Sequence, residues 1–384
     1  MGKTLISLLL ATLLVVHGKK PAWGRNLSVK RTTSPLGYQI LDGGAKVVFI
    51  FDENIHHQAA VTSVHVVGTF NQWTVAPDWQ LSPAGQGLWV LAVPTAKAAI
   101  PGNSGYAEFK FIVNETDAVS PLPTVPPGYT FKGNNLLLLP DADRDQIIAN
   151  EKTATTIKKR ADFDLTREED RKTIANFRLV PGTDKLFRSY HPAQEAKPYD
   201  ATVGRLAYVN QLIAAHGIRS IISLSGAYGD PPTYMISKDV QAIIDAGHFF
   251  ALTPSYESVY YQSDTAAFAN QLKNIIEFII DPAHPAPFLV HCRIGTDRTG
   301  VVSAIIAGLC QASWESIGLD YQKSNAVGME EYRDLRLLQY AFENMLKRRI
   351  EPHTDLKSVL SMYFINNGYL TPLQIGLLNR KLKN

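Results

Sequence analysis

The chain has 384 residues, of which 45% are hydrophobic and 19% are charged, and its formal net charge is +3. These values are typical of globular proteins and exclude a disordered, collagen-like or coiled-coil chain. So small a positive charge gives no reason to expect nucleic acid as a partner. With only two cysteines, a disulfide framework and a four-cysteine zinc site are also excluded. The length allows two domains, each with its own hydrophobic core.

The first 18 residues have the pattern of a secretory signal peptide. Lys3 is followed by an apolar run over residues 4–16, and Gly18 stands where a signal peptidase would cut. The run is too short for a comfortable membrane span. We therefore predict that residues 1–18 are removed and that the mature protein is secreted or periplasmic, with no stable membrane span. An uncleaved N-terminal anchor or a buried helix is the alternative.

Residues 43–140 alternate between short β-rich runs and Gly, Pro or Asn. Several short strands with no helical periodicity between them indicate a small antiparallel β-sandwich, which we expect to be immunoglobulin-like. The strand candidates are residues 45–51, 62–67, 87–93, 107–113 and 135–139.

Residues 141–172 carry many charges of both signs and no glycine, and they are predicted to be a partly helical linker. From residue 173 to residue 384, strands alternate with helical stretches, and the last 60 residues are mainly helical. This order predicts an α/β domain with a mostly parallel central sheet flanked by helices. The clearest elements are buried strands at 218–224 and 287–291 and helices at 264–280 and 299–312.

The segment from Cys292 to Arg298 joins a predicted strand to a predicted helix. Gly295 permits the dihedral angles of a tight turn. Consecutive backbone amides in such a turn form an anion nest at the helix N-terminus, and Arg298 can hold two phosphate oxygens. The same positive surroundings favour the thiolate of Cys292, which predicts a nucleophile for phosphate esters. Thr299 could hydrogen-bond the sulfur and help it leave, while His291 is expected to orient the loop.

The sequence His291-Cys292, then five residues, then Arg298-Thr299-Gly300 resembles the phosphate-binding loop of the cysteine-dependent protein tyrosine and dual-specificity phosphatases. Residues 177–180, 186–192 and 217–224 resemble the family's entry segment and the strand after it. Residues 320–325 and 354–382 resemble bacterial tyrosine phosphatases of the branch that includes lipid-phosphate-hydrolysing members.

The resemblance implies a cysteine-dependent phosphatase domain over residues 173–384. It would hydrolyse phosphate monoesters through a cysteinyl-phosphate, with a phosphorylated protein as the first expected substrate. A phosphoinositide, an inositol phosphate or a phosphoglucan is the alternative, and a non-catalytic phosphate- or glucan-binding protein is an alternative of another class. The residues expected around the substrate phosphate are Arg293, Ile294, Gly295, Thr296, Asp297 and Arg298.

Phosphatases of this family carry an aspartate that protonates the leaving oxygen. Some branches with an Asp-Arg-Thr ending are thought to use the loop aspartate, so Asp297 is the first candidate, Asp264 the second and Glu257 the third. Asp297 has a second interpretation, as a partner of loop amides, and Asp264 as a helix N-cap. Cys310 lies in an apolar helix and is expected in the core, whereas a buried, inert thiol is the alternative for Cys292.

The N-terminal region has a second resemblance, to glycogen- and starch-binding modules, through residues 66–73, 106–112 and 133–135. It implies a glucan partner, because flat aromatic faces stack on sugar rings while amides and amines bind hydroxyls. No second tryptophan follows the run 106–112, and a packing module without sugar is the alternative. Trp79 and Trp89 are expected in the core, and no metal or cofactor is predicted. The implied sugar-binding residues are Trp73, Lys110, Asn134 and Asn135.

Overall fold

The computed structural model describes residues 35–383, apart from residue 59 and the segments 198–203 and 230–234. The predicted signal peptide, residues 1–18, lies outside the described residues. Within the part that is described, no helix is long and apolar enough to cross a membrane.

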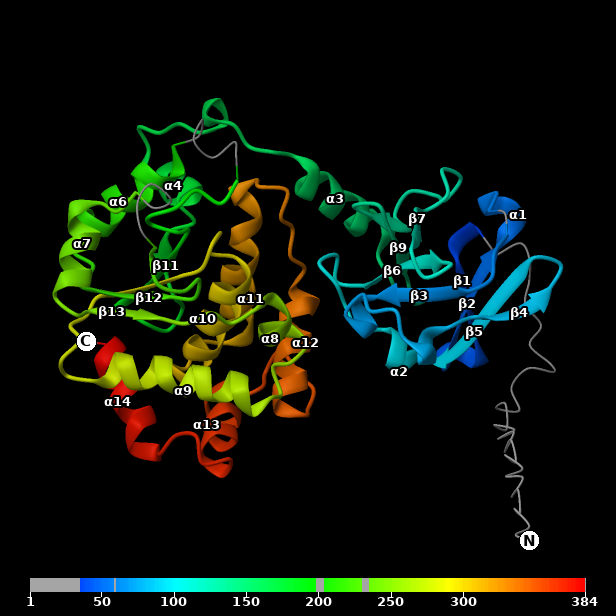
Figure 1. Ribbon diagram of the computed structural model, residues 1–384. Helices are drawn as coiled ribbons and strands as arrows, with labels where there is room; N and C mark the ends of the chain where they lie inside the picture. The colour runs from blue at the N-terminus through cyan, green and yellow to red at the C-terminus, as the bar shows by residue number, and fades with distance from the viewer. Residues whose placement is uncertain (1–34, 59, 198–203, 230–234, 384) are drawn as a thin grey trace, which may run out of the picture.

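The N-terminal region consists of two antiparallel sheets (Figure 1). The first sheet has the order β1-β2-β5-β4, and the second has the order β3-β6-β9-β8 with β7 beside β6. The strands of the first sheet are β1 Tyr38–Leu41, β2 Lys46–Asp52, β4 Ser82–Gly85 and β5 Leu88–Pro94. Those of the second are β3 Val64–Gly68, β6 Ala107–Val113, β7 Asp117–Val119, β8 Thr130–Phe131 and β9 Asn134–Leu137. Two short helices, α1 Glu53–His56 and α2 Thr95–Ala98, lie between strands.

Aromatic side chains of the two sheets pack against each other and form a shared core. Phe49 of β2 meets Phe109 of β6 edge-on with ring centroids 5.2 Å apart, and Phe51 meets Phe111 at 5.4 Å. All four side chains are almost fully buried, as strand residues at alternating positions should be on the inner face of a sandwich. The five predicted strands are all present, and the shorter strands β1, β4, β7 and β8 were not expected. Trp79 and Trp89 are buried, as predicted.

The segment 141–172 contains two helices, α3 Arg144–Thr155 and α4 Glu168–Ile174. Helix α3 is not a free spacer, because Ile147 is fully buried in an apolar cluster with Tyr106 of the sandwich and Tyr332 of the C-terminal region. In Figure 1 the sandwich and the C-terminal region lie side by side, with α3 running between them.

The C-terminal region is built on a five-stranded sheet with the order β10-β11-β14-β12-β13. Strands β11, β14, β12 and β13 are parallel, and only the edge strand β10 is antiparallel, which confirms a mostly parallel sheet. The strands are β10 Arg178–Leu179, β11 Leu186–Ser189, β12 Ser220–Ser223, β13 Phe249–Ala251 and β14 Phe288–His291.

Successive residues of a strand point to opposite faces of the sheet. Because the strand residues on both faces are apolar, helices cover both faces. Leu289 of β14 packs in one core cluster, and Phe288 and Val290 pack in the other. The cluster around Leu289 includes α6 Arg205–Ala215 and α7 Lys238–Asp245. The opposite face carries α8 Tyr256–Tyr260, α9 Ala266–Ile280, α10 Asp297–Leu309, α11 Trp314–Lys323, α12 Leu335–Leu346, α13 Leu356–Asn366 and α14 Pro372–Leu382.

Candidate active site

The loop between β14 and α10 lies at the carboxyl edge of the parallel sheet, where ligands of open α/β sheets bind. Cys292 follows β14 directly and is only 3% exposed, and Asp297 is the first residue of α10. Both cysteines are free, and burial raises the pKa of Cys310 to about 11, so Cys310 is the core residue that the sequence predicts.

The first carbonyl groups of the loop accept hydrogen bonds from residues that do not belong to the segment 292–296. Cys292 O lies 3.0 Å from His291 Nδ1, and Arg293 O accepts from the backbone amide of His191 at 3.3 Å. His191 follows β11, the strand next to β14, so a neighbouring segment of the sheet edge supports the loop.

The next two carbonyl groups are held by side chains. Ile294 O accepts from Asn176 Nδ2 at 3.1 Å, and Gly295 O accepts from Arg188 Nη2 at 2.6 Å. Neither Asn176 nor Arg188 is predicted as a site residue from the sequence, although Arg188 lies within the 186–192 segment that resembles the family. Nothing in the pattern around them indicates that they contact a loop 118 and 107 residues later.

These four carbonyl groups determine where the following amides point. The C=O and the next N–H of a trans peptide point in opposite directions, so the amides of residues 293–296 face away from the supporting groups. None of the four donates a hydrogen bond to another described residue. They lie directly before the N-terminus of α10, and free amides at a helix N-terminus are groups that can bind an anion.

Gly295 is required by this loop for two reasons. Its φ is +80°, in the left-handed region that favours glycine, and an added Cβ would lie 2.3 Å from the Ser189 carbonyl oxygen of β11. The backbone of the loop therefore packs directly on the backbone of the neighbouring strand.

Arg188 brings a charge behind the loop, and that charge is paired. Its side chain is 1% exposed, and Nη1 lies 2.6 Å from Asp320 Oδ2, while Arg178 Nε binds the other carboxylate oxygen at 2.6 Å. Burial opposes ionisation of Asp320, but the two guanidinium groups hold its pKa below the ordinary value. A buried carboxylate bridging two arginines keeps Arg188 aimed at the loop.

His291 is neutral and acts as a hydrogen-bond bridge. Its Nε2 lies 2.7 Å from the Tyr228 hydroxyl, and its Nδ1 faces Cys292 O. A carbonyl can only accept, so Nδ1 carries the proton and Nε2 accepts from Tyr228. Burial and the charge of Arg298 lower the pKa of His291 to about 4, despite the opposing bond to Cys292 O. The neutral imidazole thus links Tyr228 to the first carbonyl group of the loop, and its role in orienting the loop stays a prediction.

Arg298 lies beside the loop at the same sheet edge. Its Nη1 donates to the carbonyl of Leu224, just after β12, at 2.7 Å. The hydroxyls of Thr296 and Thr299 are buried and have no hydrogen-bond partner among the described residues. No hydrogen bond joins Thr299 Oγ1 to Cys292 in the described structure, so the role expected for Thr299 stays a prediction.

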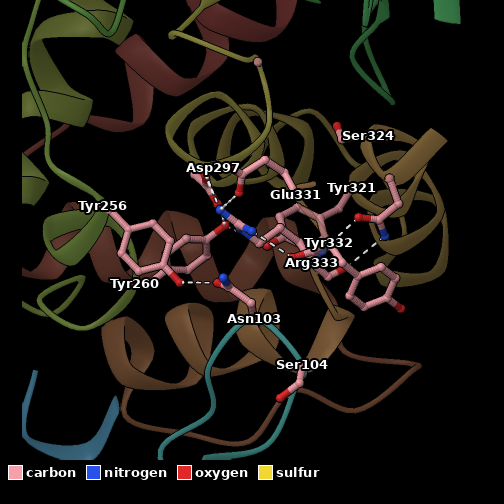
Figure 2. A network of polar contacts seen from close by, with 12 residues as sticks. Asn103, Ser104, Tyr256, Tyr260, Asp297, Tyr321, Ser324, Glu331, Tyr332 and Arg333 are labelled. Carbon is pink, nitrogen blue, oxygen red and sulfur yellow. Dashed lines mark hydrogen bonds and ion pairs between the residues drawn. The ribbon is translucent and has the colours of Figure 1, made fainter. Parts of the chain in front are cut away.

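Asp297 is held by side chains from α8 and from the segment before α12 (Figure 2). Arg333 binds both of its oxygens, Nε to Oδ1 and Nη2 to Oδ2 at 2.9 Å, and the Tyr260 hydroxyl donates to Oδ1 at 3.0 Å. The Arg333 side chain is 5% exposed. Burial alone would lower its pKa, but Asp297 and neighbouring groups hold the pKa well above its ordinary value. Arg333 lies in a charged segment with no motif, so no pattern in the sequence identifies it.

In the part of the chain that the structure describes, the other two carboxylates proposed as general acids make no hydrogen bond or ion pair with the loop. Asp264 accepts from Lys347 at 2.7 Å and from Asn344 at 3.3 Å. It is not the N-cap of α9 either, because the hydroxyl of Thr265 accepts from the helix amide, so that alternative is wrong. Glu257 is exposed on α8.

A cavity of about 260 Å³ lies between the sandwich and the C-terminal region, and it contains two of the four predicted sugar-binding residues. Trp73, which is 39% exposed, and Asn134 line it, whereas Lys110 and Asn135 do not. Burial raises the pKa of Glu108, which accepts from Asn134 Nδ2 at 2.8 Å. The full lining is Thr69, Trp73, Gly102, Asn103, Glu108, Asn134, Tyr256 and Tyr261.

The model of the tyrosine phosphatase family matches residues 149–363, more than half of the chain. The chain therefore belongs to the tyrosine phosphatase family, and it is a cysteine-dependent phosphatase.

Two solved structures are similar to this chain. One is the core catalytic domain of the PP-IP phosphatase SIW14 from S. cerevisiae in complex with citrate. It is 18% identical with a TM-score of 0.29, and the match covers 51% of this chain and 94% of that one. The other is a structure of the Siw14 catalytic core, 17% identical with a TM-score of 0.28, covering 51% and 93% of the two chains. No curated protein matches this chain.

The depressed pKa of His291 makes stability depend on pH. Between the ordinary value of 6.5 and about 4, the unfolded chain binds a proton that the folded one does not. The contribution of His291 to the free energy of unfolding is therefore fully present above pH 6.5. As the pH falls toward 4, the folded protein loses on the order of 3 kcal/mol of this stability. We expect His291→Asn, which keeps an N–H for Cys292 O, to flatten the pH dependence of the unfolding free energy in urea titrations. An unchanged slope would contradict the assignment.

Proposed function

We propose that the loop 292–298 binds the phosphate of a phosphate monoester and that Cys292 is the nucleophile. The observation that carries the proposal is the outward bonding of four consecutive carbonyl groups, which turns the amides of residues 293–296 inward beside the thiol. Arg298, at the same edge, supplies a guanidinium for the phosphate oxygens.

The chemistry that suits this arrangement is a double displacement at phosphorus. The thiolate of Cys292 attacks phosphorus, the bond from phosphorus to the ester oxygen breaks, and the departing oxygen takes up a proton from the solvent. Water then attacks the cysteinyl-phosphate, which releases inorganic phosphate and restores the thiolate. The inward amides and Arg298 are fixed before the reaction and stabilise negative charge on the transferred group in both steps.

The test is hydrolysis of para-nitrophenyl phosphate by the reduced protein. We expect Cys292→Ser to lower kcat by at least about a thousandfold, because a serine hydroxyl is far less ionised than a thiol near neutral pH. Cys310→Ala is the matched control, since Cys310 is the chain's other free cysteine and lies in the core. Full activity of Cys292→Ser would refute the proposal.

For Asp297 we propose a role as the anchor of the loop, because both of its oxygens are bound by Arg333. A general acid must carry a proton and present it to the leaving oxygen, and here neither oxygen is unoccupied. The role of Asp297 as general acid stays a prediction from the sequence, and leaving-group dependence separates the two roles.

We expect Asp297→Asn to lower kcat/KM by the same factor, about tenfold, for para-nitrophenyl phosphate and for phenyl phosphate. Loss of an anchor affects every substrate equally, whereas loss of a general acid affects chiefly the poorer leaving group. The measurement is the ratio of the two kcat/KM values. A much larger loss on phenyl phosphate would assign Asp297 as the acid instead.

For the substrate we propose a small molecule with more than one phosphate group, such as an inositol phosphate. Two guanidinium groups belong to the loop, those of Arg293 and Arg298. Arg293 is exposed, and the one recorded bond of its guanidinium, to Ala196 O at 2.6 Å, uses one of five N–H donors. A protein phosphotyrosine or phosphoserine substrate is the second candidate.

We expect Arg293→Ala to lower kcat/KM on inositol hexakisphosphate about tenfold more than on a phosphotyrosine peptide. Arg219→Ala is the control, because Arg219 is exposed and precedes β12 at the opposite edge of the sheet. Equal losses on both substrates would favour the protein substrate.

We also propose that the cavity beside Trp73 binds a sugar unit of a glucan. The cavity is lined by the aromatic rings of Trp73, Tyr256 and Tyr261 and by polar groups that include Asn134, with no lysine or arginine among its lining residues. Aromatic rings beside hydrogen-bonding side chains, which here include the carboxyl group of Glu108, suit a polyhydroxy ligand.

Retention on glycogen or amylose tests this idea. We expect Trp73→Ala to abolish retention and Trp73→Phe, which keeps a ring, to restore part of it, because stacking needs only an apolar face. A wild-type protein that is not retained would refute the sugar proposal and leave the phosphatase proposal unaffected.

A further inference from the structure

We propose that the N-terminal sandwich positions the phosphate-binding loop, with Asn103 and Arg333 as positioning residues. The inference rests on the proposed function of the loop. Asn103 of the sandwich makes two contacts beside Arg333, and Arg333 in turn holds Asp297 of the loop.

Asn103 lies between α2 and β6 of the sandwich and contacts two elements of the C-terminal region (Figure 2). Its Oδ1 accepts from the Tyr256 hydroxyl of α8 at 2.7 Å. Its backbone carbonyl accepts from the amide of Asp334, the N-cap of α12, at 2.9 Å. One residue of the sandwich therefore bonds both the tyrosine whose ring lies near Arg333 and the backbone of the residue that follows Arg333.

Both contacts of Asn103 bear directly on Arg333. The guanidinium carbon of Arg333 lies 5.7 Å from the ring centroid of Tyr256, and Asp334 is the next residue in the chain. Figure 2 shows the Arg333 guanidinium with Asp297 and Glu331 around it. Because the guanidinium is planar and its bonds to Asp297 are bidentate, a small movement of Arg333 displaces the carboxylate that it holds.

The junction between the sandwich and Asp334 is close. Gly105 has a φ of +82°, and a Cβ there would lie 2.4 Å from Asp334 Cγ, so the backbone packs on the carboxylate itself. Asp334 also accepts from Arg336 N at 2.9 Å and from Asn150 Nδ2 of α3 at 3.4 Å. The segment before α12 is thus held by the sandwich, by α3 and by its own helix.

The consequence for the loop follows from the position of Asp297, which precedes Arg298 and begins α10. If Arg333 loses its support, the C-terminal limb of the loop is no longer fixed, and the amides and Arg298 no longer converge on one phosphate. Binding of phosphate should weaken together with turnover, since the same groups hold the ground state and the transition state.

The test compares Asn103→Ala and Tyr256→Phe with Tyr261→Phe. Each tyrosine variant removes one hydroxyl that bonds the segment 101–103 of the sandwich, since Tyr261 donates to Pro101 O at 3.2 Å. The hydrogen bond of Tyr256 is part of the path to Arg333, and that of Tyr261 is not. The readouts are the inhibition constant of inorganic phosphate, kcat/KM on para-nitrophenyl phosphate, and Tm.

We expect Asn103→Ala and Tyr256→Phe to raise the phosphate inhibition constant and to lower kcat/KM about tenfold, and Tyr261→Phe to change either by less than about twofold. All three should lower Tm by similar amounts. Adding Asp297→Asn to Asn103→Ala should weaken phosphate binding no further than Asp297→Asn alone, because both changes act on the same contact, that between Arg333 and Asp297.

The proposal is overturned if Asn103→Ala lowers Tm but keeps the wild-type affinity for phosphate, or if Tyr256→Phe and Tyr261→Phe behave alike. Calorimetric binding of inorganic phosphate to Cys292→Ser, with and without Asn103→Ala, gives the same comparison without turnover. A wild type that hydrolyses nothing would therefore refute the proposed function, while the loss or retention of phosphate binding would still decide the positioning role.

Discussion

The orientation of four consecutive peptide groups is the constraint on which the rest of the site depends. A carbonyl group that accepts a hydrogen bond on one side of the loop makes the next amide point to the other side. The loop after β14 repeats this at each residue from 292 to 295. Three of the four supporting groups, on Asn176, Arg188 and His191, come from segments far from the loop in the chain. A buried arginine on β11, paired with Asp320, makes one of these bonds, so a costly buried charge is used to hold a backbone.

Much of the fold could be predicted because its signals are local. The strands β2, β3, β5, β6, β9, β12 and β14 lie in apolar runs bounded by turn residues, and α9 and α10 show helical spacing, so these patterns identify them. The strands that were missed are two to four residues long, so each offers few positions from which a pattern can be recognised, although β9, β12 and β14 are no longer than four residues. The cap of α9 was assigned one residue early because an Asp-Thr pair offers two capping side chains, and only the geometry selects Thr265.

The candidate site was predictable only where it is contiguous. Cys292, Gly295 and Arg298 lie within one loop whose spacing is itself the signal. Asn176, Arg188 and Arg333 approach the same loop from distant segments, and their residue types alone do not distinguish them from surface polar residues. The cavity beside Trp73 illustrates the same limit, because it brings together two of the residues implied by resemblance and adds tyrosines from the other region of the chain.

The apolar cluster around Ile147 has a consequence for how the molecule unfolds. It takes side chains from the sandwich, from α3 and, through Tyr332, from the segment before α12. Opening either region would expose apolar surface on the other, which favours one cooperative transition over two independent ones. A destabilising change deep in the sandwich, at Phe109 for example, would then shorten the lifetime of the folded phosphatase as well, although it lies far from the thiol in sequence.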